Sequence, residues 1–122
     1  MIRGMGLYGP DGVNDVDDVR SWQQPGDGHP EPKLRELFQT CSTNPADFIW
    51  LGLFEPTKDE LEMVARVFSL PRLQVEDSAN DQQRAKFELD ENGYGLAVLK
   101  TLDYVDATSD VHTGQLAVFV GP

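Results

Sequence analysis

The hydrophobic pattern of this chain changes to a period of two near residue 86, and this change limits the folds that the chain can adopt. Between residues 57 and 79 apolar residues recur mainly at helical spacing, whereas Phe87-Glu88-Leu89-Asp90 begins a strict alternation. A period of about 3.6 residues is typical of helices, and a period of two is typical of strands. The predicted order is a helix, a strand, two helices and then a run of antiparallel strands. This order predicts an α+β fold, in which helices pack on a mixed, largely antiparallel sheet.

Three helices are predicted. The first begins at Pro32, and the second begins at the capping box of residues 57–60, Thr-Lys-Asp-Glu. Their apolar faces are Leu34, Leu37, Phe38 and Cys41 in the first and Leu61, Val64, Ala65 and Phe68 in the second, with Glu62 and Arg66 on the wet face of the latter.

The third predicted helix is short. It follows Pro71 and spans residues 73–79, so Glu76 and Asp77 lie near its C-terminal end. Negative charge at that end opposes the helix dipole, which costs up to about 1 kcal/mol unless a cation or a hydrogen-bond donor compensates it.

The predicted strands differ in how they are covered. Residues 47–54 are apolar on both faces, which favours a central strand of a covered sheet. Asn92-Gly93 predicts a hairpin turn, followed by a strand with Tyr94, Leu96, Val98, Leu102 and Tyr104 on one face. After a polar turn at residues 106–110, residues 111–120 form a last strand. Trp50, Phe68 and Tyr104 are expected to be core or half-buried packing residues.

The first 31 residues differ in composition from the rest. They hold six of the 11 glycines and many aspartates, so residues 1–31 are predicted to be irregular, with one short strand near Leu7. The acidic cluster Asp11, Asn14, Asp15, Asp17 and Asp18 lacks the glycine and the closing glutamate of a calcium loop, and is interpreted as a solvated loop. Residues 32–122 form the predicted domain, with one core for a chain of 122 residues.

Charge and composition exclude several functions. A formal charge of −11 repels phosphate backbones and anionic membranes, so no nucleic-acid partner is expected. Cys41 is the only cysteine, which rules out an internal disulfide. No apolar run approaches the roughly 20 residues of a membrane helix, and the chain is expected to be soluble. His29 and His112 lack the sequence context of a catalytic triad, so no catalytic residue and no enzymatic activity are predicted.

Residues 34–122 resemble the cytoplasmic N-terminal domain of the CorA family of magnesium channels, most closely the actinobacterial type. The matching residues include Phe48 to Leu53, Glu60-Leu61, Val75-Glu76-Asp77, Gln83-Arg84, Lys86, Val98 to Thr101, Tyr104 and Gln115 to Phe119, and the most specific element is Glu76-Asp77 followed by Gln83-Arg84-x-Lys86. The chain departs from the family at Pro71-Arg72, where His-Pro is usual, and at Ala85, where Pro is usual. Residues 1–31 match nothing in the family.

The resemblance implies an α/β/α sandwich that senses divalent cations at the cytoplasmic face of the cell membrane. In the homopentameric channel, Glu76 and Asp77 would contribute to a regulatory Mg²⁺ site between one subunit and the stalk helix of the next; relatives use Co²⁺ or Zn²⁺. Such a chain is C-terminally truncated, since the stalk, the membrane helices and the pore entrance would follow Pro122. It could not conduct ions by itself, and it would meet the membrane only through the missing part.

Alternative interpretations remain open at this stage. From the pattern alone, Glu76 and Asp77 are ordinary surface acids, and Arg84 and Lys86 pair with neighbours such as Asp77 or Glu88. The domain could be a stand-alone acidic interaction module with the same fold, or could belong to a zinc-transporting relative. If nothing covers Leu116 to Val120, that strand is an open sheet edge, through which the chain would self-associate by strand pairing.

Overall fold

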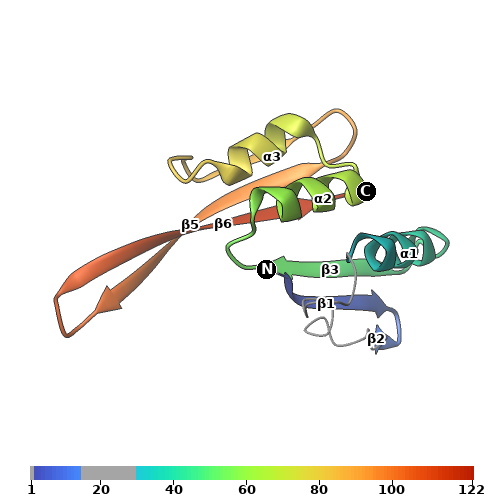
Figure 1. Ribbon diagram of the computed structural model, residues 1–122, viewed down its shortest axis with the longest axis horizontal. Helices are drawn as coiled ribbons and strands as arrows, with labels where there is room; N and C mark the ends of the chain where they lie inside the picture. The colour runs from blue at the N-terminus through green and yellow to red at the C-terminus, as the bar shows by residue number, and fades with distance from the viewer. Residues whose placement is uncertain (1, 15–29) are drawn as a thin grey trace. The chain divides into compact units, whose positions relative to one another are not determined.

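The computed structural model describes residues 2–14 and 30–122, and these form two compact units, Met1–Ser69 and Leu70–Pro122. Each unit contains a three-stranded antiparallel sheet, and the described residues include three helices (Figure 1). The predicted α+β class is confirmed. The division into units differs from the predicted boundary after residue 31, because the first strand pairs with residues 48–53 across it.

The Met1–Ser69 unit orders its strands β2-β1-β3, with β1 at Ile2–Gly9, β2 at Gly12–Asn14 and β3 at Phe48–Leu53. Two of these features correct the sequence-based expectations. The strand near Leu7 is eight residues long and belongs to a hairpin. Within the described part of this sheet β3 has a single neighbour, β1, so it lies at an edge and is not central.

Tyr8 of β1 covers a glycine of its own strand and contacts β3. Trp50 lies opposite Gly6, and Phe48 lies opposite Tyr8, whose ring stacks on it at 5.1 Å. A Cβ atom at Gly6 would come within 2.8 Å of the Tyr8 ring, so this ring occupies the space over the glycine. Aromatic cover of this kind supports a strand that is otherwise poor in side chains. Trp50 is 58% exposed, contrary to the expected packing role.

Two helices complete this unit, α1 at Glu31–Ser42 and α2 at Lys58–Phe68. The predicted capping box is present, with the Thr57 hydroxyl accepting from the Glu60 N–H at 3.2 Å. The buried stripe of α2 is Met63, Val64 and Val67, so only Val64 of the predicted face is fully buried.

Glu31 links the two helices. Its carboxylate accepts from Arg66 of α2 at 3.2 Å and from Arg35 at 2.7 Å. These hydrogen bonds, Arg66 first, lower the pKa of Glu31. The rings of Phe38 and Phe68 meet edge to face at 5.6 Å, which adds an apolar contact between the same helices.

The Leu70–Pro122 unit contains α3 at Arg72–Ala79 and orders its strands β4-β5-β6, with β4 at Lys86–Leu89, β5 at Gly95–Val105 and β6 at Asp110–Val120. The predicted hairpin is confirmed, and Gly93 takes the positive φ of +85° that its turn requires. The core of this sheet is Leu96 and Val98, which are fully buried. β5 and β6 continue as a two-stranded ribbon beyond α3 (Figure 1).

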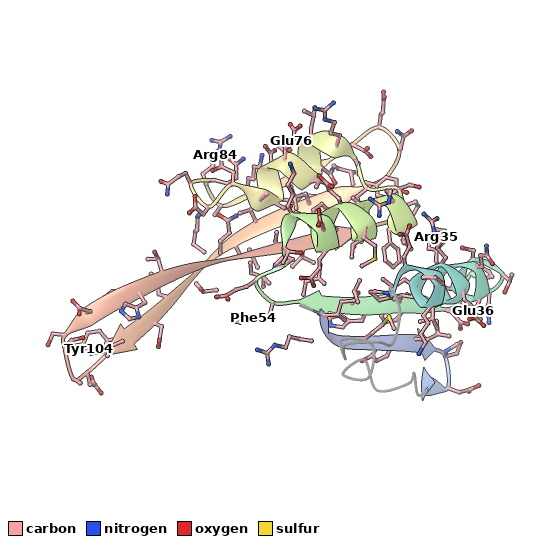
Figure 2. All side chains as sticks on the ribbon, viewed as in Figure 1. Arg35, Glu36, Phe54, Glu76, Arg84 and Tyr104 are labelled. Carbon is pink, nitrogen blue, oxygen red and sulfur yellow. The ribbon has the colours of Figure 1, made fainter. Side chains whose placement is uncertain are left out.

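The ribbon explains a second correction. Tyr104 was expected to pack, but its side chain is 60% exposed near the ribbon's end (Figure 2). Phe68 is half-buried as predicted. Among the described residues, none of the helices has both the length and the apolar character needed to span a membrane.

Candidate functional site

The α3 helix, which carries Glu76 and Asp77, is held on its sheet by polar contacts. Gln74 is its one buried residue, 5% exposed, and its Nε2 donates to the backbone oxygen of Tyr94 at 3.0 Å. Its Oε1 has no hydrogen-bond partner among the residues that the structure describes. Leu73, by contrast, is exposed. A directional hydrogen bond therefore fixes the helix where apolar packing is sparse.

Donors from the sheet meet the C-terminal end of α3. Gln115 Nε2 donates to the backbone oxygen of Asn80 at 3.0 Å, and Lys100 Nζ donates to that of Asp81 at 3.2 Å. Lys100 also donates to Gln115 Oε1 at 2.6 Å. These contacts tie the loop after α3 to the sheet, and the Lys100 ammonium lies near the negative end of the helix dipole.

The two predicted metal ligands lie at this same end, and each already contacts one cation of the chain. Arg72 Nε donates to Glu76 Oε1 at 3.0 Å, one helical turn away. Lys86 Nζ donates to Asp77 Oδ2 at 2.7 Å. The side chain of Glu76 projects outward from α3 (Figure 2). Two cationic side chains of the chain itself, Arg72 and Lys86, therefore compensate these carboxylates.

Lys86 bridges two acids. Its ammonium also donates to Glu88 Oε1 at 2.9 Å, so it joins the end of α3 to β4. Its side chain is only 12% exposed, which makes this pair less screened than a typical surface ion pair. The hydrogen bond to Asp77, followed by the one to Glu88, raises the pKa of Lys86 above its ordinary value.

The remaining coordinating capacity is small. Glu76 and Asp77 each use one carboxylate oxygen in these contacts, and the second oxygen of each accepts no hydrogen bond from the described residues. Within those residues, no three His, Cys, Asp or Glu side chains are grouped so that they could hold a metal ion. The two carboxylates are thus at most part of a coordination sphere, and Mg²⁺ accepts such a part because it retains most of its waters.

The other candidate residues do not assemble into a site. Arg84 is exposed and forms no ion pair with a described residue, unlike the pairing predicted for it (Figure 2). His112 is exposed on β6, as expected. His29, Asp15, Asp17 and Asp18 lie outside the described residues. The Cys41 thiol donates to the backbone oxygen of Asp47 at 3.4 Å, and burial, then the Asp47 carboxylate, raises its pKa.

Sequence reasoning missed the residues that hold the helix end, namely Gln74, Lys100 and Gln115. Polar residues inside a helix or a strand carry no periodic signal that distinguishes a buried or anchoring side chain from a solvated one. The Arg72–Glu76 pair, in contrast, has a spacing of four residues, which is typical of ion pairs on a helix, but Arg72 lies one residue before the predicted helix.

No protein-family model matches the chain, and no curated protein matches it at a significant level.

Proposed function

We propose that this chain is the cytoplasmic, divalent-cation-sensing domain of a CorA-like Mg²⁺ channel, and that Glu76 and Asp77 supply carboxylates to a regulatory Mg²⁺ site between subunits. The role is regulatory and not catalytic. The proposal rests on the resemblance of residues 34–122 and on the arrangement of charge at the end of α3.

The position of the two carboxylates is the observation that carries the proposal. Adjacent acids at a helix C-terminus add to the negative end of the dipole, so the end of α3 favours a cation. Arg72 and Lys86 already partly neutralise them, at 3.0 and 2.7 Å. A metal ion must compete with these side chains. Weak binding follows, which suits a sensor that responds to cellular Mg²⁺ at high concentration.

The small number of ligands supports a site shared between chains. Two carboxylates leave most of a Mg²⁺ coordination sphere to water or to another subunit. Acids that face each other across a subunit interface repel until a cation lies between them, and this difference in stability would let Mg²⁺ shift the channel towards a closed state. The proposed partners are therefore the other subunits of a homopentamer and their stalk helices.

We expect the isolated chain to bind Mg²⁺ with a dissociation constant of about 1 mM or weaker, because the ligands of a second subunit are absent. Amide chemical-shift mapping during a Mg²⁺ titration should show changes centred on Glu76 and Asp77. D77N should abolish them. D103N removes one exposed carboxylate from β5 of the same unit, away from α3, and serves as the matched control. Shifts confined to residues 11–18, with Glu76 and Asp77 silent, would refute the site.

A stand-alone acidic interaction module remains the second candidate function. One observation favours it: the sheet of the Leu70–Pro122 unit exposes large apolar side chains that include Phe87 and Leu89. Exposed apolar patches rimmed by polar residues mark interaction sites. A chain of this kind would fail the Mg²⁺ titration and would still associate through that surface.

A further inference from the structure

The sheet of the Leu70–Pro122 unit has two unlike faces. One face carries Lys86, Val98, Lys100 and Gln115. The two lysines and the glutamine each form a hydrogen bond with α3 or with the loop that follows it. α3 therefore covers this face (Figure 1). Because side chains alternate along a strand, the intervening residues point to the opposite face.

The opposite face, which we call the apolar face, carries almost no polar atoms over its central part. The strand register places six large apolar residues on it, around Ala97: Phe87, Leu89, Leu99, Leu116, Val118 and Val120. Five of these are between 49% and 68% exposed, Val118 being the half-buried one. Phe87 lies beside Gly95, where a Cβ atom would be in van der Waals contact with the ring at 3.4 Å.

The area of the apolar face is large for a solvated surface. If a fully exposed residue of this size presents about 200 Å², the five exposed residues offer on the order of 500 Å². Two such faces in contact would bury on the order of 1,000 Å², the lower limit for a specific interface. A second copy of the chain therefore brings enough surface for a weak but specific dimer.

Charge is arranged so that two copies can meet here. None of the six residues is charged, and the nearest acids lie beyond the ends of the apolar face, with Asp90 and Glu91 at the hairpin turn and Asp103 on the ribbon. Two sheets stacked about 10 Å apart at a large crossing angle would place these acidic ends away from each other. The net charge of −11 on each chain still opposes association at low salt.

We propose that this apolar face is a self-association surface, on which two copies of the chain stack sheet on sheet about a two-fold axis. An isologous contact of this kind is closed, so it gives dimers and not fibres. The proposal does not depend on the cation site. It also differs from pairing of β6 edges, because it uses side chains of the central strand β5.

The experiment is sedimentation velocity on the full chain between about 10 μM and about 1 mM, at low salt and at about 0.15 M salt. We expect a monomer–dimer equilibrium that strengthens with salt. L99K places a charge at the centre of the apolar face and should weaken dimerisation at least tenfold. L102K is the matched control, since Leu102 is on the same strand but on the other face, 74% exposed. It should dimerise like the unaltered chain.

A strict monomer at every concentration and salt overturns the proposal. If L99K dimerises as strongly as the unaltered chain, the proposal is also overturned, and the contact would be assigned to the β6 edge. An equal loss of dimerisation in L102K would overturn it as well. Methyl resonances of the unaltered chain provide a second measurement if L99K fails to fold. Those of Leu99, Leu116 and Val118 should shift with concentration, whereas that of buried Leu34 should not; unchanged shifts in all four contradict stacking.

Discussion

Replacing Leu96 by alanine is expected to destabilise the Leu70–Pro122 unit by about 2 to 5 kcal/mol, the range found for large-to-small changes at buried sites. Leu96 is 0% exposed on β5, between Glu88 of β4 and Phe119 of β6. Only Leu96 and Val98 among the described residues of this unit are apolar and fully buried, so few neighbours can move into the vacated space. A domain is stable by only about 5 to 15 kcal/mol, and the loss is therefore a large fraction of the total.

Native-state amide hydrogen exchange measures this effect within the unit, without the assumption that the whole chain unfolds in one step. Exchange of the β5 amides should accelerate in L96A by the factor that corresponds to the lost stability. L102A is the control, because Leu102 lies on the same strand and the same face but is solvent-exposed; its effect should be within about 0.5 kcal/mol. Equal acceleration in the two variants would mean that Leu96 does not form the core of this sheet.

Much of the local structure could be predicted because its signals lie in adjacent residues. The capping box at Thr57 to Glu60, the start of α3 after Pro71 and the turn at Gly93 each occur where predicted. Capping and turn geometry depend on residues a few positions apart, so the sequence contains the whole interaction.

Burial and strand neighbours could not be predicted in the same way. Residues 61–68 contain apolar side chains on more than one helical face, and only packing selects Met63 and Val67 over Leu61 and Phe68 for full burial. Similarly, residues 47–54 are apolar on both faces, and this pattern predicts a covered central strand. In the structure β3 lies at an edge of its sheet, where the ring of Phe48 stacks on that of Tyr8 in β1 and Trp50 is exposed. The apolar pattern of the strand does not distinguish such an edge position from burial between two layers.

The candidate site likewise has features that the sequence predicts and features that only the structure reveals. The positions of Glu76 and Asp77 near the end of α3, and the pairing of Lys86 with Asp77 and Glu88, were predicted from spacing and charge. The anchoring by Gln74 was not, because a buried glutamine is recognisable only once its partner, the Tyr94 backbone, is known.

Replacing Lys86 by methionine is expected to lower stability and to raise Mg²⁺ affinity several-fold in the same variant. Methionine keeps much of the side-chain volume but removes the ammonium that Asp77 and Glu88 share at 2.7 and 2.9 Å. The two carboxylates would then repel each other, and the competitor of Mg²⁺ at Asp77 would be gone. Mg²⁺ should bind the folded variant more tightly and restore part of the lost stability by linkage. Thermal denaturation of K86M with and without Mg²⁺, together with calorimetric titration, measures both changes.

The pH dependence follows from the raised pKa of Lys86. A group whose pKa is higher in the folded state stabilises the fold while it is protonated in both states, and this contribution is lost as the pH rises through the folded-state value. The unaltered chain should therefore lose stability at alkaline pH, above the ordinary lysine pKa, and K86M should lack this step.

K86R provides the control for the metal test, since it keeps a cation that can bridge the two acids, and its Mg²⁺ affinity should stay close to that of the unaltered chain. The double variant K86M with D77N separates the two roles of Asp77. It relieves the repulsion between Asp77 and Glu88, so stability should recover without Mg²⁺. It also removes a proposed ligand, so the gain in affinity should disappear. A K86M chain that is destabilised but binds Mg²⁺ no better than the unaltered chain would leave Lys86 as a structural bridge and would exclude Asp77 as a Mg²⁺ ligand within a single chain.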